Sequence, residues 1–314
     1  MKKITLLFAL ASASIVVAQS QVANSDLELW ENLGAPTEEP INWNSFKTGS
    51  GNFAGFANKQ IEQSTNIRAG ATGMYCARIW STSVLGIVAN GTMTCGRINM
   101  GSTTPSNPAN YNYSSTADPL FSETCVNTPD SIVFWVKYTQ AGGGNQTARL
   151  HAILHDAYDV HDPIDAGSDP HVIATAELDY PATGGSWTRK SVPFIPTANT
   201  GLVPGFILVT FATNSTPGGG AANDEVLIDD ISLVYNGADI DEQFSAKHTV
   251  NYNEGSLKIF GNPTGDVKIY AMNGSEVYSG IAASSIKISL NTGLYVVQLK
   301  ELNGKIYNLK FAVN

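Results

Sequence analysis

The chain has 314 residues and a formal net charge of −9 at neutral pH, and 43% of its residues are hydrophobic while only 14% are charged. This composition can fill a sizeable core and argues against a nucleic-acid partner, which would need a basic face. Frequent turn residues, without a sustained i, i+3, i+4 apolar pattern, favour an all-β protein over a helical one.

Residues 1–18 have the pattern of a secretory signal peptide. A basic start at 1–3 is followed by an apolar run over 4–17, and small side chains occupy the cleavage positions at 16–18. The run is shorter than the roughly 20 residues that cross a bilayer, and no other segment is apolar enough to do so. We therefore expect a mature chain that begins near Gln19, has no transmembrane segment, and is secreted or held at the cell surface.

Residues 24–235 alternate between apolar and polar side chains in short runs separated by turns rich in Gly, Pro and Asn. About ten strands at this spacing are typical of a jelly-roll β-sandwich. The predicted strands are 26–31, 72–80, 84–89, 92–100, 131–139, 147–155, 171–178, 187–194, 205–212 and 225–235.

This domain contains all three cysteines, Cys76, Cys95 and Cys125. Disulfides persist in exported chains, but an odd count leaves at least one thiol unpaired, and the sequence does not choose the pair. The wide spacing does not fit zinc ligands, which come in close pairs. Three buried thiols without a disulfide fit the sequence equally well.

A glycine-rich loop separates the strands 131–139 and 147–155, so we expect them to form a hairpin. Only one register parity places apolar side chains opposite each other. On the face away from the core, that register brings together Trp135, Lys137, Arg149 and His151.

An aromatic ring flanked by hydrogen-bond donors is how many jelly-roll proteins hold a sugar ring. These four residues are therefore predicted to bind carbohydrate. The alternative is that Trp135 packs beneath a loop, because Val133 and Ile153 lie on the same face.

Histidines and aspartates are concentrated between His151 and His171. A hydrolase or transition-metal site is one interpretation. However, His151 and His155 lie in a strand rather than at helical spacing, and the Pro and Gly residues within 156–170 indicate a loop. Aspartates in loops usually form turns, so a solvated loop is favoured, with Ca²⁺ bound by the loop as an alternative.

The sequence contains none of the common catalytic motifs: no G-x-S-x-G elbow, no H-E-x-x-H and no G-x-x-x-x-G-K-[ST]. Four carboxylates could serve a glycosidase, but the sequence does not pair them. They are Glu28, Glu177, Asp229 and Asp230. A binding protein is therefore favoured over an enzyme.

Residues 236–254 have little patterning and are predicted to form a flexible linker. In 255–314 the period-two alternation returns, in a series of predicted hairpins. We expect a small immunoglobulin-like β-sandwich without chemistry of its own, because this segment has no His or Cys. The turns are predicted at 261–263, 273–274, 291–293 and 303–304.

Three segments of this tail, 256–274, 286–299 and 310–313, resemble in order the C-terminal sorting domain of type IX secretion substrates in Bacteroidetes. The family's Asn-Pro stands here at 262–263 and its Gly-Leu-Tyr at 293–295, whereas a strand usual after the Asn-Pro turn is missing. The resemblance implies export by the type IX machinery, cleavage of the tail, and release or attachment to surface lipopolysaccharide. The alternative is an immunoglobulin-like module without a sorting role.

Five segments of the larger domain resemble, in order, the carbohydrate metabolism domain of Bacteroidetes, a family named by inference that is similar to jelly-roll carbohydrate-binding modules. The resemblance implies a galactose-binding-like sandwich and a role with glycans. The segments are NSDLELWENL at 24–33, GMYCARIW at 73–80, PDSIVFWVKY at 129–138, GSWTRKSVPF at 185–194 and EVLIDDISLVY at 225–235.

Similar jelly-roll modules often hold a structural Ca²⁺ between an acidic residue of the first strand and an Asp of the last, here Glu28 and Asp229. Alternation places Asp229 on one face with Leu227, Ile231 and Leu233, so its carboxylate is expected to be buried unless Asp230 turns inward instead. A buried carboxylate needs a partner, which is either the metal or a hydrogen-bond donor.

Three functions fit these features. The leading one is a secreted or cell-surface protein that binds glycans and is exported by the type IX machinery. The others are a glycoside-active enzyme and a structural or adhesive surface protein that binds another protein. The leading function depends mainly on the second resemblance, because composition alone does not choose among the three.

Overall fold

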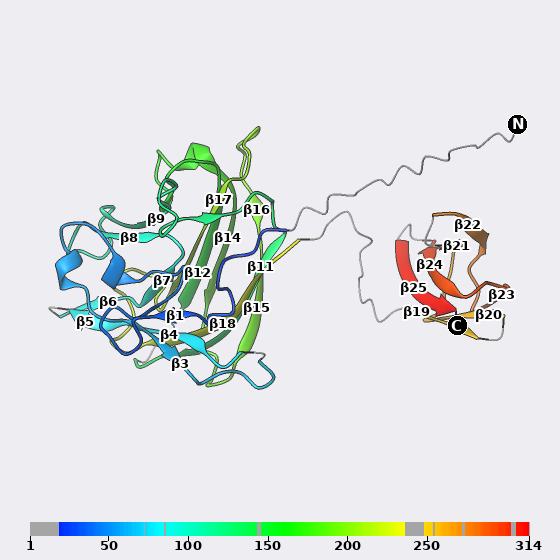
Figure 1. Cartoon of the computed structure of the whole chain (residues 1–314), viewed down its shortest axis with the longest axis horizontal. Helices are drawn as coiled ribbons and strands as arrows, with labels where there is room; N and C mark the ends of the chain where they lie inside the picture. Colours follow the sequence, from blue (N-terminus) through cyan, green and yellow to red (C-terminus); the bar gives the residue numbers. More distant parts are fainter. Residues whose placement is uncertain are drawn as a thin grey trace, which may run out of the picture. The chain divides into compact units, whose positions relative to one another are not determined.

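The computed structural model describes residues 19–235 and 248–313, apart from 72, 85, 143–145, 254, 272–273 and 303–305. The chain divides into two compact units, with the boundary between Tyr235 and Asn236 (Figure 1). The predicted signal peptide, 1–18, and residues 236–247 of the predicted linker lie outside the described residues. Within the described part of the chain, no helix has the length and apolar character needed to span a membrane.

The larger unit is a sandwich of two antiparallel sheets, which confirms the predicted jelly-roll class. The first, called the β11 sheet, has the strand order β15 (Thr188–Pro193), β11 (Ser131–Thr139), β18 (Glu225–Val234), β4 (Cys76–Trp80) and β3 (Ile61–Ser64). The second, called the β12 sheet, has the order β10 (Glu123–Thr124), β17 (Phe206–Ala212), β12 (Ala148–His155), β14 (Val172–Tyr180) and β16 (Ile195–Pro196), with β7 (Thr92–Thr94) also paired to β17.

The core lies between the two sheets, because alternate residues of each strand are apolar and point inward. The Phe134 ring of β11 contacts Phe211 of β17 and Tyr180 of β14, with ring centroids 5.2 and 6.0 Å apart. These contacts join the two sheets. The predicted inward faces of β11 and β12 are confirmed, since both are fully buried: Ile132, Phe134, Val136 and Tyr138, and Ala148, Leu150, Ala152 and Leu154.

The predicted hairpin between 131–139 and 147–155 is wrong. β11 pairs with β15 and β18, whereas β12 pairs with β14 and β17, so the two strands belong to different sheets. Their inward faces meet across the core, and their outward faces point in opposite directions. The same alternation is expected for two strands that pair side by side and for two strands that face each other, so the pattern did not distinguish these arrangements.

A small third sheet in the larger unit has the order β13 (His161–Asp162), β9 (Asn110–Tyr113) and β8 (Arg97–Met100). A second small core lies on the outer face of the β12 sheet, made of Ile153, Val160, Val172 and Leu208. The predicted strand 92–100 is divided between β7 and β8. The break falls at Gly96, where a Cβ atom would lie 2.3 Å from the carbonyl oxygen of Tyr113, so only glycine fits.

Two other predicted strands, 26–31 and 84–89, differ from the elements that the structure contains. Within 26–31 only Trp30–Glu31 (β1) forms a strand, which pairs with Glu39–Pro40 (β2). A turn at 23–26 precedes it, and Asn24 and Leu27 have φ values of 46° and 56°. Residues 84–89 fold into the hairpin β5 (Thr82–Val84) and β6 (Ile87–Ala89). Three short 3₁₀ helices complete the unit: η1 (Phe46–Thr48), η2 (Ala54–Phe56) and η3 (Asp169–His171).

The three cysteines are all buried and free, as in the second of the two predicted alternatives. Burial raises the pKa of the Cys76 thiol to about 12, so it stays protonated at neutral pH. These thiols act as small core residues.

The smaller unit is also a two-sheet sandwich, in agreement with the predicted fold class. Its core includes the fully buried Val267, Ile269, Val297 and Leu299. β19 lies inside the predicted linker, so the linker was predicted too long. One sheet has the order β19 (Thr249–Asn253), β20 (Ser256–Phe260) and β23 (Ser285–Lys287), and the other β22 (Glu276–Ile281), β21 (Asp266–Ala271), β24 (Gly293–Lys300) and β25 (Ile306–Val313).

Candidate functional site

Trp135 and Lys137 lie on the outer face of the β11 sheet, where Trp135 is half-buried. The guanidinium carbon of Arg68 lies 4.7 Å from the centroid of the Trp135 ring. Arg68 is held there by Asp230, whose Oδ2 accepts a hydrogen bond of 2.9 Å from Nε. One face of the indole is therefore covered by a paired cation and is not open for stacking against a sugar.

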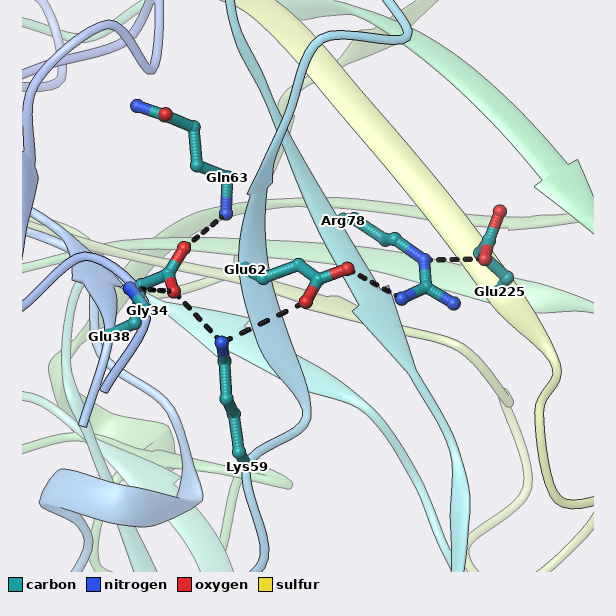
Figure 2. A network of polar contacts seen from close by, with 7 residues as sticks. All are labelled: Gly34, Glu38, Lys59, Glu62, Gln63, Arg78 and Glu225. Atoms are coloured by element: carbon teal, nitrogen blue, oxygen red, sulfur yellow. Dashed lines mark hydrogen bonds and ion pairs between the residues drawn. The ribbon is translucent and has the colours of Figure 1, made fainter. Parts of the chain in front are cut away.

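Charged side chains near β3, β4 and β18 form a chain of ion pairs (Figure 2). Arg78 donates to Glu62 from Nη1 at 2.7 Å and to Glu225 from Nε at 2.6 Å. Lys59 lies 2.8 Å from Glu38 and 3.8 Å from Glu62. Each of these five groups has a partner of opposite charge, so the network is satisfied within the protein itself.

Glu28 and Asp229, the predicted Ca²⁺ ligands, have different environments. Oε1 of Glu28 accepts hydrogen bonds from the backbone N–H groups of Met74 and Tyr75 at 2.9 and 2.8 Å. Asp229 is 2% exposed, and its Oδ1 accepts a bond of 2.8 Å from the N–H of Asp230. Its Oδ2 is buried without a hydrogen-bond partner. Burial, reinforced by the charge of Asp230, raises the pKa of Asp229 to about 7.

The predicted burial of Asp229 is confirmed, but its predicted face is wrong. Asp230 has a φ of 46°, and the register against β11 shifts by one residue between Val133 and Trp135. This bulge turns Ile231 and Leu233 into the core together with Val226 and Ile228, and it leaves Asp229 outside that cluster.

The unpartnered oxygen of Asp229 is chemically suited to a hard cation. Among the residues that the structure describes, however, no group of three or more His, Cys, Asp or Glu side chains is placed to hold a metal ion. A Ca²⁺ ion at this position would therefore need backbone carbonyls or water molecules as most of its ligands.

Arg149 and His151 lie on the outer face of the β12 sheet, on the opposite side of the sandwich from Trp135 and Lys137. The four predicted carbohydrate-binding residues thus form two separate pairs. Arg149 contacts Asp179 at 2.7 Å from Nε and Glu177 at 3.0 Å from Nη2.

His151 is held by a carboxylate from the small third sheet. Its Nδ1 lies 2.8 Å from Oδ1 of Asp162 in β13. Burial by itself lowers the pKa of His151, but the charges of Asp162 and Glu177 outweigh burial and raise the pKa above its usual value. We call the surface formed by Arg149, His151, Asp162, Glu177 and Asp179 the polar shelf.

A cavity of about 420 Å³ begins at the edge of the polar shelf. Asp162 lines this cavity and also binds His151, so the cavity and the shelf meet at this residue. Figure 1 shows the surrounding elements, β5, β6, β8, β9 and the helices η1 and η2, gathered at one end of the larger unit. The lining includes nine large apolar or aromatic side chains, namely Phe46, Phe53, Phe56, Val84, Ile87, Val88, Ile98, Met100 and Tyr111.

The cavity wall is held by contacts behind it. The buried Gln60 donates from Nε2 to the carbonyl oxygens of Trp80, Ala89 and Asn90, each at 3.0 Å. The ring of Tyr111 stacks on His161 with centroids 4.0 Å apart. These contacts hold the wall in place without a ligand.

The remaining histidines of 151–171 each have a separate partner. His155 is buried against Ser114 Oγ at 2.8 Å, and burial lowers its pKa to about 4, so it is neutral at pH 7. His161 binds Asp165 and His171 binds Asp156. Asp165 also accepts the N–H groups that close its turn, as expected of a loop aspartate.

Sequence reasoning missed the cavity. Its residues come from short elements far apart in the chain, several of which were not predicted. The cluster of Phe46, Phe53 and Phe56 was the one available signal, since three aromatic residues in a polar, glycine-rich stretch need a common surface to pack against.

No protein-family model matches the chain, and no curated protein matches it. Solved structures do match. A candidate glycoside hydrolase from Bacteroides thetaiotaomicron has a TM-score of 0.52 and 17% identity, over 70% of this chain and 72% of that chain. A candidate glycoside hydrolase from Bacteroides vulgatus has a TM-score of 0.49 and 16% identity, over 69% and 98%.

The family 11 carbohydrate-binding module from Clostridium thermocellum also matches, with a TM-score of 0.30 and 12% identity over 70% of this chain and 98% of the module. At this level of identity, the likeness to the Bacteroides thetaiotaomicron protein establishes a shared β-sandwich fold and nothing finer. The resemblances to the two Bacteroidetes families therefore stay predictions.

Proposed function

We propose that the larger unit binds neutral glycans on the polar shelf, in a protein that is secreted or displayed at the cell surface. The observation that carries this proposal is that Arg149, His151 and three carboxylates lie together next to a cavity with aromatic walls. Planar polar side chains bind sugar hydroxyls, and aromatic rings stack on sugar faces.

The charge of the shelf favours a neutral ligand. Arg149 and, when protonated, His151 supply at most two positive charges to the three carboxylates Asp162, Glu177 and Asp179. A phosphate or uronate would meet net negative charge and be repelled. Sugar hydroxyls can donate to carboxylates and accept from arginine, so they fit both signs of charge.

The test is binding to a panel of neutral oligosaccharides, followed by calorimetry on any that bind. Arg149→Ala and Glu177→Ala are expected to weaken binding about tenfold or more, because each leaves a polar group of the complex unpaired. Binding that is lost in Trp135→Ala but kept in both shelf variants would move the site to the other sheet. Absence of binding across the panel would overturn the proposal.

A glycoside-active enzyme is the second candidate. The observation that favours it is that His151 contacts Asp162 and stands opposite Glu177 in the pairing of β12 with β14, so two carboxylates share one surface, as glycosidases require. Turnover of an oligosaccharide that is abolished by Glu177→Gln would establish the activity.

We propose in addition that the smaller unit is the sorting domain of a type IX substrate. Its separate core and the order of its motifs support this, and Asn262 adopts a φ of 54° immediately before Pro263, as a tight turn at that motif requires. In a type IX-competent host, deletion of 255–314 is expected to stop export of the full chain. Unchanged export would refute the assignment.

The third proposal is that Ca²⁺ binds between Glu28 and Asp229 and satisfies the free oxygen of Asp229. A chelator is then expected to lower the Tm of the purified protein, and Asp229→Asn to remove that sensitivity. An identical Tm with and without chelator would exclude a structural metal ion.

A further inference from the structure

The cavity beside the polar shelf is a poor match for a sugar ring alone. Its lining residues include nine large apolar or aromatic side chains. A sugar ring carries hydroxyl groups around its whole edge, and hydroxyls buried without partners cost free energy. The group that fills this cavity should therefore be largely apolar.

The mouth of the cavity is apolar as well as the interior. Phe56 is 62% exposed and Ile87 is 39% exposed, although both line the cavity. Large apolar side chains at a rim are favourable when a ligand removes them from water. An apolar group that enters the cavity would cover both side chains.

The size of the cavity limits the group that it can hold. An apolar cavity of about 150 Å³ holds a benzene molecule. This cavity measures about 420 Å³, close to three times that volume, and so admits an alkyl chain of several carbons or an aryl group of two rings.

One buried polar atom in the wall has no partner within the protein. Oδ1 of Asn90 is buried without a hydrogen bond, while its Nδ2 donates to the carbonyl oxygen of Asn214 at 2.9 Å. Because Nδ2 is engaged in this way, Oδ1 is an acceptor of fixed position. An alkyl aglycone has no donor for this atom, so a hydroxyl or N–H group elsewhere on the ligand would be needed to satisfy it.

We propose that the shelf and the cavity form one site for an amphipathic glycoside, with the sugar on the polar shelf and an apolar alkyl or aryl aglycone in the cavity. This inference rests on the proposed function and deepens it by naming the class of ligand. Asp162 lines the cavity and also contacts His151, so it lies at the junction, where the glycosidic oxygen of such a ligand would be expected.

The test uses β-glycosides of glucose, galactose, mannose and xylose, each with methyl, butyl, hexyl and octyl aglycones, and titrates the full chain below micelle-forming concentrations. For the sugar that binds, affinity should rise about fourfold per added methylene until the cavity is full, and then level off. Phe56→Ala and Val88→Trp should abolish this rise, the first by removing a wall and the second by filling the space. Phe260→Ala, in the smaller unit and 52% exposed, is the matched control and should change nothing.

The outcomes separate this inference from the proposed function. If methyl glycosides bind and longer aglycones bind no better, the cavity is unused and the inference is overturned, while glycan binding stands. If octanol binds as tightly as the octyl glycosides, and Glu177→Ala has no effect, the shelf does not bind sugar and both proposals fail. If no glycoside of the panel binds, the inference is overturned. Thermal unfolding of each variant excludes misfolding as the cause of a loss.

Discussion

The two outer faces of the sandwich have similar residues and opposite character. On the β11 sheet, Trp135 lies under Arg68, and Arg78 is shared between Glu62 and Glu225. On the β12 sheet, Arg149 and His151 also have carboxylate partners, but one of these partners, Asp162, lines a cavity. On the first face the stacking surface is occupied by the protein's own Arg68, whereas the second face adjoins an apolar cavity.

The difference shows that an aromatic residue flanked by cations is not sufficient for a sugar site. On the β11 sheet the cation covers the ring itself, which stabilises the fold and occupies the stacking surface. On the β12 sheet the aromatic rings belong to other elements and line a separate hollow. The position of the cavity therefore distinguishes the two faces better than the types of side chain on them do.

The largest expected effect concerns Asp229, the buried carboxylate on the β11 side that has one oxygen without a hydrogen-bond partner. Its raised pKa means that its contribution to stability is present below pH 4 and is lost between about pH 4 and 7. In the presence of a chelator, the Tm of Asp229→Asn should therefore increase relative to the Tm of the wild type as the pH rises from 4 to 8, by roughly 3 to 8 °C. Asp169→Asn, at an exposed position, is the control. If the Tm difference between Asp229→Asn and the wild type does not change with pH, the Asp229 carboxylate is not destabilised by its burial.

The second prediction compares the two faces directly through ligand affinity. For a bound neutral glycan, Arg149→Ala should raise Kd about tenfold, while Lys137→Ala on the other sheet should leave it unchanged. Isothermal calorimetry with both variants checks this. Equal losses from the two substitutions would mean that the effect is not local to the shelf.

The third and smaller effect is the pH dependence of the bond between His151 and Asp162 on the polar shelf. Because the pKa of His151 is raised, its bond to Asp162 contributes fully below the ordinary histidine pKa and is lost as the pH rises through the raised value. Relative to His151→Gln, the wild type should lose about 1 kcal/mol of stability between pH 6 and 9. Urea denaturation across this range measures it. A difference between the two proteins that does not change with pH would show that the bond to Asp162 does not depend on the charge of His151.

The smallest effect is expected from the ion-pair network of Figure 2. Arg78 and its two partners are each about one-third exposed, so Arg78→Met should cost less than about 1 kcal/mol, and less still in 1 M salt. Denaturation at low and high salt tests this, with the exposed Arg189→Met as control. A large loss that is insensitive to salt would mean that the aliphatic stem of Arg78, rather than its charge, stabilises this face.

The sequence by itself determined the class of both sandwiches and the inward faces of β11 and β12, because burial of alternate residues leaves a period-two pattern within single strands. The burial of Asp229 was also predicted, but from a face that the bulge at Asp230 changes, so the prediction was right without its reason. The glycans, the export route and Ca²⁺ came from resemblance and remain to be tested.

Only the tertiary structure decided which strands are neighbours. Alternation is local and does not encode strand order, so Trp135 and His151 were placed together although they lie on opposite sides of the sandwich. The bulge at Asp230 likewise depends on its pairing with β11. The cavity could not be derived from any single segment, because it is an empty volume enclosed by elements that are distant in the chain.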